Sequence, residues 1–134
     1  MSASRWAAGF GAWALALSVS AFAQATKTSV KAGVYTEAQA VSGEAIYKGK
    51  CASCHTPGYF TDRDFYTNFA SKPLWELFDA ISDSMPEDNP GSLKKEEYAQ
   101  VIAFVLKLNK FPAGTTELPT DKDALTAILM QKPE

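Results

Sequence analysis

Both cysteines of this chain and its only histidine lie within five consecutive residues, Cys51-Ala52-Ser53-Cys54-His55. Any chemistry that needs thiol or imidazole groups must therefore be built around this one segment. A zinc site would need further ligands, and no other cysteine or histidine is present to supply them. A thioredoxin-like dithiol would need a βαβ context, which the sequence lacks.

The spacing C-x-x-C-H is instead typical of the covalent attachment of a c-type haem. Two thiols separated by two residues on a helical turn can each add to one vinyl group of the porphyrin. The adjoining histidine then lies under the macrocycle, where a ring nitrogen can bind the iron. The segment predicts one covalently bound haem c, held by Cys51 and Cys54 and ligated by His55.

The second iron ligand cannot be another histidine of this chain, because His55 is the only one. Methionine is the usual alternative in electron-transfer cytochromes. Met85 lies in a loop rich in turn-forming residues, where Pro86 and Pro90 restrict the backbone. Met130 lies in an apolar helical pattern, in which core filling is the default role. We therefore predict Met85 as the sixth ligand; the alternative is an open sixth position that binds a gas.

The N-terminal segment has the pattern of an export signal. Arg5 precedes an uncharged stretch that runs from Trp6 to Thr26, and Ala21-x-Ala23 resembles a signal-peptidase site. The apolar run is short for a bilayer span. We predict a signal peptide over residues 1–23 and a periplasmic protein without stable membrane insertion after cleavage. The alternative is an uncleaved membrane anchor.

The rest of the chain reads as a flexible leader, residues 24–35, followed by one all-α domain, residues 36–134. Thr36 and Gln39 form a capping-box pattern, and Gly43 inside the helix that follows indicates a close helix crossing. No strand pattern competes with the helical ones. The expected elements are a helix from Thr36 to about Lys50, an irregular aromatic loop from Thr56 to Ser71, a helix from Leu74 to about Ser82, a helix capped by Ser92 that reaches Leu108, and a short helix from about Asp121 to Met130.

From Thr36 to Leu108 the sequence resembles the class I monohaem cytochromes c. The haem motif and Met85-Pro86 carry the resemblance, and Gly43, Tyr47 and Phe104 match the family's crossing of its N- and C-terminal helices. The family's fold is all-α, with about three to five helices around one covalently attached haem. Residues 85–93 and 109–119 also resemble bacterial members associated with quinoprotein alcohol dehydrogenases.

The resemblance implies a periplasmic electron carrier rather than an enzyme, with redox proteins as partners: a quinoprotein dehydrogenase as donor and an oxidase or other protein as acceptor. The formal net charge of −2 gives no global field suited to nucleic acids. Two alternatives stay open at this point. One is a haem-bearing subunit tightly bound to a larger dehydrogenase, and the other is the five-coordinate gas-binding cytochrome.

Overall fold

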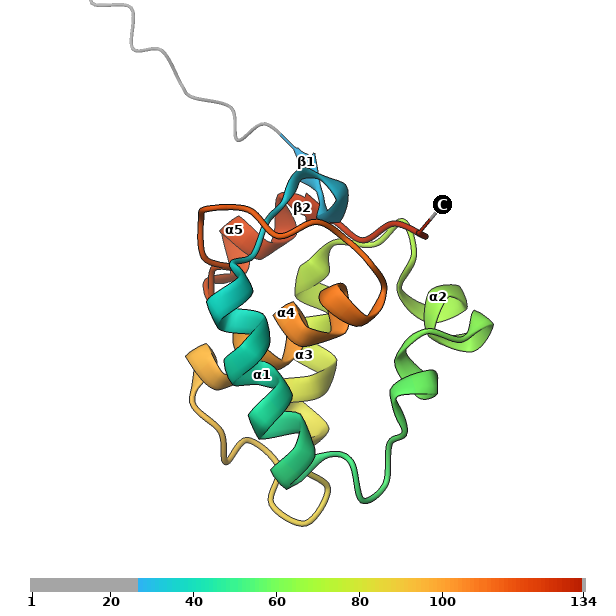
Figure 1. The fold of residues 1–134 in the computed structure, drawn as a ribbon, viewed down its shortest axis with the longest axis vertical. Coiled ribbons are helices and arrows are strands. Elements are labelled where there is room, and N and C mark those ends of the chain that lie inside the picture. Colours follow the sequence, from blue (N-terminus) through green and yellow to red (C-terminus); the bar gives the residue numbers. More distant parts are fainter. Residues whose placement is uncertain (1–26, 134) are drawn as a thin grey trace, which may run out of the picture.

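The computed structural model describes residues 27–133, and over that range the chain is mostly helical, as expected for a class I cytochrome c fold (Figure 1). Two pairs of residues form short parallel strands, and two short 3₁₀ helices join the main elements. In chain order the elements are β1 (Thr28–Ser29), η1 (Val30–Ala32), α1 (Glu37–Lys50), η2 (Pro57–Phe60), α2 (Arg63–Phe69), α3 (Leu74–Ser84), α4 (Lys95–Leu108), α5 (Lys122–Thr126) and β2 (Ile128–Leu129).

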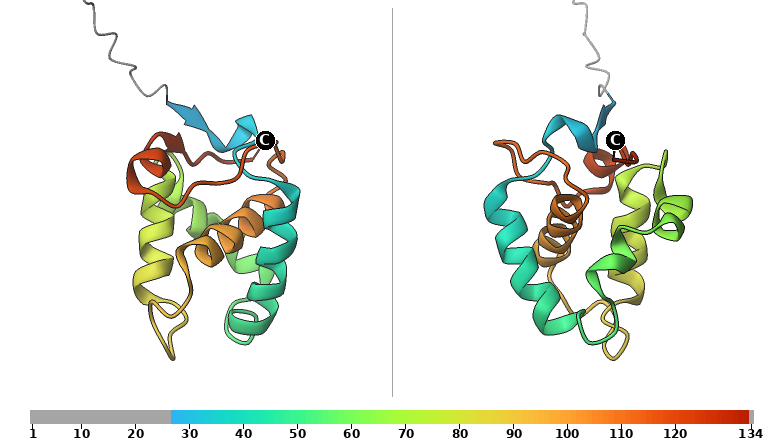
Figure 2. Two further views of the ribbon diagram at one scale, coloured as in Figure 1. Left: turned by 90° about the vertical axis from the view of Figure 1, so that its left-hand side faces the viewer. Right: turned by 45° about the vertical axis from the view of Figure 1, so that its right-hand side comes forward.

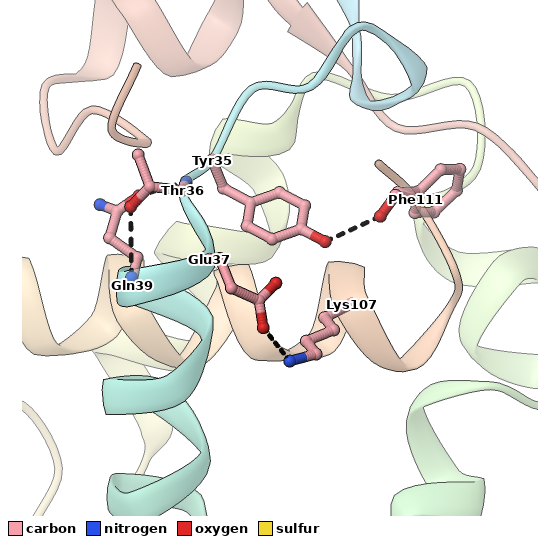
Figure 3. A network of polar contacts seen from close by, with 6 residues as sticks. All are labelled: Tyr35, Thr36, Glu37, Gln39, Lys107 and Phe111. Atoms are coloured by element: carbon pink, nitrogen blue, oxygen red, sulfur yellow. Dashed lines mark hydrogen bonds and ion pairs between the residues drawn. The ribbon is translucent and has the colours of Figure 1, made fainter. Parts of the chain in front are cut away.

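Helix α1 begins with the predicted capping box. The Thr36 hydroxyl accepts from the Gln39 amide at 3.2 Å, and the Thr36 amide donates to the Gln39 side chain at 3.2 Å (Figure 3). Two of the backbone N–H groups that a helix start leaves without partners are thereby satisfied. The same Gln39 side chain is buried and also bonds both backbone groups of Leu118. This one residue therefore ties the start of α1 to the C-terminal segment.

Helices α1 and α4 cross at Gly43, which confirms the prediction made from its position. A Cβ at residue 43 would lie 1.8 Å from the carbonyl oxygen of Gln100 in α4, so no larger residue fits there. One turn later the rings of Tyr47 and Phe104 pack with centroids 5.1 Å apart. An ion pair between Glu37 and Lys107 joins the same two helices (Figure 3).

The second predicted helix is confirmed, with a C-terminus two residues beyond the expected one: α3 follows Pro73 and ends at Ser84. Leu74, Leu77 and Phe78 are buried, which gives the helix one apolar face toward the core. Trp75 stacks on Phe78 at 5.5 Å.

The predicted N-cap of the next helix is wrong. Helix α4 begins at Lys95, and the cap position is Lys94, whose amide donates to the Glu97 carboxylate at 2.7 Å. The Ser92 amide instead donates to the carbonyl of Asn89 at 3.3 Å and belongs to the preceding loop. A capping box places its acidic residue three positions after the cap, and Glu97 therefore sets the cap at Lys94 and not at Ser92.

The segment from Thr56 to Ser71 is not the irregular loop that its composition suggested. It contains η2 and α2, and the Asp62 carboxylate caps α2 by accepting from the Phe65 amide at 2.8 Å. Phe65 and Tyr66 are buried on one side of this helix. Asn109 holds the segment to the end of α4, because its side chain donates to the Phe60 carbonyl and accepts from the Tyr66 hydroxyl.

The leader and the C-terminal segment also differ from the sequence prediction. Thr28–Ser29 pairs in parallel with Ile128–Leu129, so the predicted final helix ends at Thr126 and a strand follows it. Val30 and Tyr35 are 0% and 1% exposed, and the Tyr35 hydroxyl donates to the Phe111 carbonyl at 2.7 Å (Figure 3). From Thr28 onward the expected flexible leader is therefore held against the domain. The predicted signal peptide, residues 1–23, lies outside the described residues.

The fold brings two loops to one end of the molecule. The chain that leaves α1 and the chain that leaves α3 both lie at the end opposite the β1–β2 pair (Figures 1 and 2). Within residues 27–133, no helix is both long enough and apolar enough to cross a bilayer.

Candidate functional site

The haem-motif segment is a tight turn at the C-terminal end of α1. The amides of Cys51 and Ala52 both donate to the Tyr47 carbonyl at 2.9 Å. The amides of Cys54 and His55 then donate to the Cys51 carbonyl, at 3.1 and 2.9 Å. Both thiols are free, with Cys51 half-buried and Cys54 exposed. The backbone thus keeps a turn on which two thiols that are separated by two residues can lie on the same side.

His55 follows this turn and lies against aromatic rings. The centroid of its ring is 4.7 Å from that of Tyr59 and 5.9 Å from that of Phe60. The Tyr47 hydroxyl donates to the His55 carbonyl at 2.5 Å. Burial, with a smaller contribution from Cys51, raises the pKa of the Tyr47 hydroxyl, which keeps it protonated and able to donate.

Met85 directly follows the last residue of α3 and occupies the C-cap position of that helix. Its amide donates to the Ile81 carbonyl at 2.9 Å, and its carbonyl accepts from the Tyr98 hydroxyl at 2.7 Å. Met85 itself is half-buried, and the adjacent Pro86 is buried. The loop that carries Met85 is therefore held at its first residue by both α3 and α4.

A cavity of about 600 Å³ joins the two segments and contains every residue that the sequence singled out for the haem. Met130 is not among the residues around it; that side chain is 0% exposed and lies in the core, as predicted from its pattern. The residues that line the cavity are Gly49, Lys50, Cys51, Ser53, Cys54, His55, Met85, Pro86, Glu87 and Asp88.

The donor set of this cavity fits a c-type haem. Cys51, Cys54, His55 and Met85 all line one space. Free thiols are the groups to which a c-type haem is attached, and an imidazole and a thioether are both groups that can ligate haem iron. In the described part of the chain, no three His, Cys, Asp or Glu side chains converge as a metal ion would require. Burial raises the pKa of the Cys51 thiol, which favours its neutral form in the chain before a haem is attached.

A family model described as cytochrome c oxidase, cbb3-type, subunit III matches residues 38–105. The chain belongs to this family. The matched range covers the α1–α4 crossing, the haem motif and Met85, and nearly coincides with the range over which the sequence resembles class I cytochromes c. The searches of curated proteins and of solved structures each gave no match.

Membership of this cytochrome c family implies a covalently bound c-type haem with iron, at the site that Cys51 and Cys54 form. It also supports a role in haem-based electron transfer. Cys51 and Cys54 have the spacing of such an attachment site, and both line the cavity described above.

Sequence reasoning missed two tyrosines that contact the site. Tyr47 was recognised for its place in the helix crossing, but not as the hydrogen-bond partner of His55. The contact of Tyr98 with Met85 was not predicted, because the two residues are thirteen positions apart and no local pattern links them. A further missed contact is Tyr59, which is 53% exposed and lies against His55.

Proposed function

We propose that this cytochrome is a periplasmic electron-transfer protein whose haem iron is ligated by His55 and Met85. The observation that carries the proposal is the cavity that Cys51, Cys54, His55 and Met85 all line, although Met85 lies thirty positions after His55 in the chain. When bound, the haem supplies a one-electron ferric/ferrous couple.

The chain contributes a fixed environment for that couple. Cys51 and Cys54 would hold the haem through thioether bonds, and His55 and Met85 would supply the ligands to its iron. A methionine ligand favours the ferrous state and raises the potential. Because the backbone of each candidate ligand makes hydrogen bonds through both its amide and its carbonyl, little rearrangement accompanies each electron.

The partners we propose are redox proteins that dock where the cavity opens. Lys50, Glu87 and Asp88 lie around it and provide charges for a small, transient contact of the kind that redox proteins form. The donor we propose is a quinoprotein dehydrogenase, on the resemblance of residues 85–93 and 109–119. The acceptor we propose is an oxidase, which the description of the matching family as an oxidase subunit supports.

The periplasmic location rests on residues 1–23, whose pattern is that of a cleaved signal peptide. Attachment of a c-type haem through free thiols is compatible with such a location. Cell fractionation combined with mass spectrometry tests the proposal: a periplasmic protein whose N-terminus is Gln24 supports it, and a cytoplasmic protein that retains the N-terminal segment contradicts it.

A second candidate is a haem-bearing subunit of a larger enzyme. The observation that favours it is the family description, which names a subunit of an oxidase. Purification of the protein from the membrane and soluble fractions of its native cells distinguishes the free carrier from the enzyme subunit. A free monomer supports the carrier, and stable co-purification with a catalytic subunit supports the second candidate.

The visible spectrum of the purified protein tests the proposed ligands. The ferric form should be low-spin and show the weak far-red band of methionine-to-iron charge transfer. The ferrous form should bind no added carbon monoxide, because Met85 fills the sixth position. A high-spin ferric spectrum with ready gas binding would contradict the carrier and support the five-coordinate alternative.

A further inference from the structure

His55 and Met85 are held by the protein in the same way. Each amide donates to the carbonyl four residues earlier, which is Cys51 for His55 and Ile81 for Met85, at 2.9 Å in both cases. Each carbonyl then accepts from a tyrosine hydroxyl, at 2.5 Å from Tyr47 and at 2.7 Å from Tyr98.

The two tyrosines come from the two helices that cross. Tyr47 lies one turn after Gly43 on α1, and Tyr98 lies two residues before Gln100 on α4, so both flank the point where the backbones touch. Their side chains are 4% and 2% exposed. Each ring is packed as well: Tyr47 against Phe104 at 5.1 Å and Tyr98 against Phe78 at 6.2 Å.

We infer that Tyr47 and Tyr98 are positioning residues, which transmit the fixed geometry of the α1–α4 crossing to the two iron ligands. Neither tyrosine lines the cavity, so each acts through the backbone of its ligand and not through the haem itself. The inference rests on the proposed function, since it takes His55 and Met85 as the ligands.

A matched control exists in the same molecule. Tyr35 is also buried, and its hydroxyl also donates to a backbone carbonyl, that of Phe111, at 2.7 Å (Figure 3). Phe111 does not line the cavity. Tyr35→Phe therefore removes the same kind of hydrogen bond with the same loss of one oxygen atom, at a place that leads to neither ligand.

The first experiment measures the affinity of the ferric holoprotein for imidazole, which competes with Met85 for the iron. In Tyr98→Phe, the Met85 carbonyl has no hydrogen-bond partner while Met85 ligates the iron. When imidazole displaces Met85 and its loop, that carbonyl can bond water instead, so the variant destabilises only the Met85-ligated state. Loss of one such bond should raise imidazole affinity about fivefold. Tyr35→Phe should leave the imidazole affinity unchanged, since the hydrogen bond to the Phe111 carbonyl is lost equally in the Met85-ligated and the imidazole-bound protein.

The second experiment records the low-spin ferric electron paramagnetic resonance spectrum, whose g-values report the orientation of the axial ligands. Tyr47→Phe should shift the g-values, and Tyr35→Phe should not. Both substitutions keep the aromatic ring, so the packing at the crossing is retained and haem content should remain that of the wild type.

The outcomes separate this inference from the function on which it rests. Met85→Ala should raise imidazole affinity far more than Tyr98→Phe does; an unchanged affinity there would overturn the proposed ligand itself. With Met85→Ala behaving as expected, wild-type imidazole affinity in Tyr98→Phe would overturn the role of Tyr98. Unchanged g-values in Tyr47→Phe would overturn the role of Tyr47.

Discussion

Tyr66 shows how one buried hydroxyl makes stability depend on pH. It donates to the Asn109 side chain, and burial raises its pKa to about 12 from the ordinary value of 10.0. Because the unfolded chain releases this proton at lower pH than the folded chain does, deprotonation favours unfolding. The stabilisation is therefore fully present below about pH 10 and is lost as the pH rises through about 12.

We expect Tyr66→Phe to lose less stability than the wild type between pH 10 and pH 12. Urea unfolding at a series of pH values gives the free energy of unfolding of each protein, and the slope of that free energy against pH is compared between the two. Tyr35 and Tyr47 also have raised pKa values, so the wild type and Tyr66→Phe should both become less stable as the pH rises. The difference between the two proteins is the contribution of Tyr66. Identical slopes would show that its hydroxyl does not titrate with unfolding.

At the level of residues, the sequence was most informative where chemistry depends on short spacing. Two thiols and an imidazole within five positions define a haem motif before any fold is known, and the structure places Met85 beside them. Tyr98 and the Met85 carbonyl meet only because α3 and α4 pack together, so their contact has no local signal.

At the level of elements, the α1–α4 crossing depends on a hydrogen atom at residue 43. In Gly43→Ala the new methyl group would lie 1.8 Å from the Gln100 carbonyl oxygen, so the helices must separate. We expect a loss of at least about 2 kcal/mol in the free energy of unfolding. Chemical denaturation of the holoprotein measures it.

Val41→Ala is the control, since it lies in the same helix, its side chain is 56% exposed and it does not line the cavity. It should leave stability unchanged or raise it by up to about 1 kcal/mol, because alanine favours a helix. Equal effects of the two substitutions would contradict the close approach at Gly43.

Elements with their own local signals were predictable, and elements that depend on distant partners were not. The capping box of α1 and the apolar face of α3 act within a few residues, and both helices were predicted close to their observed ends. Strand β1 exists only because Ile128–Leu129 lies beside it, about a hundred residues later in the chain. Helix α2 has a local signal in its N-cap Asp62, but the aromatic residues around it suggested an irregular loop, and the helix was not predicted.

At the level of the whole molecule, the fold leaves space for the haem that membership of the family implies. The described chain leaves a cavity of about 600 Å³ between the haem motif and the Met85 loop. The double variant Cys51→Ala/Cys54→Ala, which cannot form thioether bonds, should have a much lower melting temperature than the holoprotein, because a group that binds only the folded chain stabilises it. Thermal unfolding by circular dichroism measures the loss. An unchanged melting temperature would show that the fold does not need the attached group.

The central claim, that Met85 is the ligand that suits this cytochrome to electron transfer, is tested by equilibrium redox titration. Met85→Ala should lower the potential by about 60 mV or more, which is tenfold in the equilibrium constant of a one-electron couple. Met130→Leu changes the methionine that is buried in the core and should leave the potential at the wild-type value. A potential that stays constant in Met85→Ala, or that falls equally in Met130→Leu, would contradict the assignment.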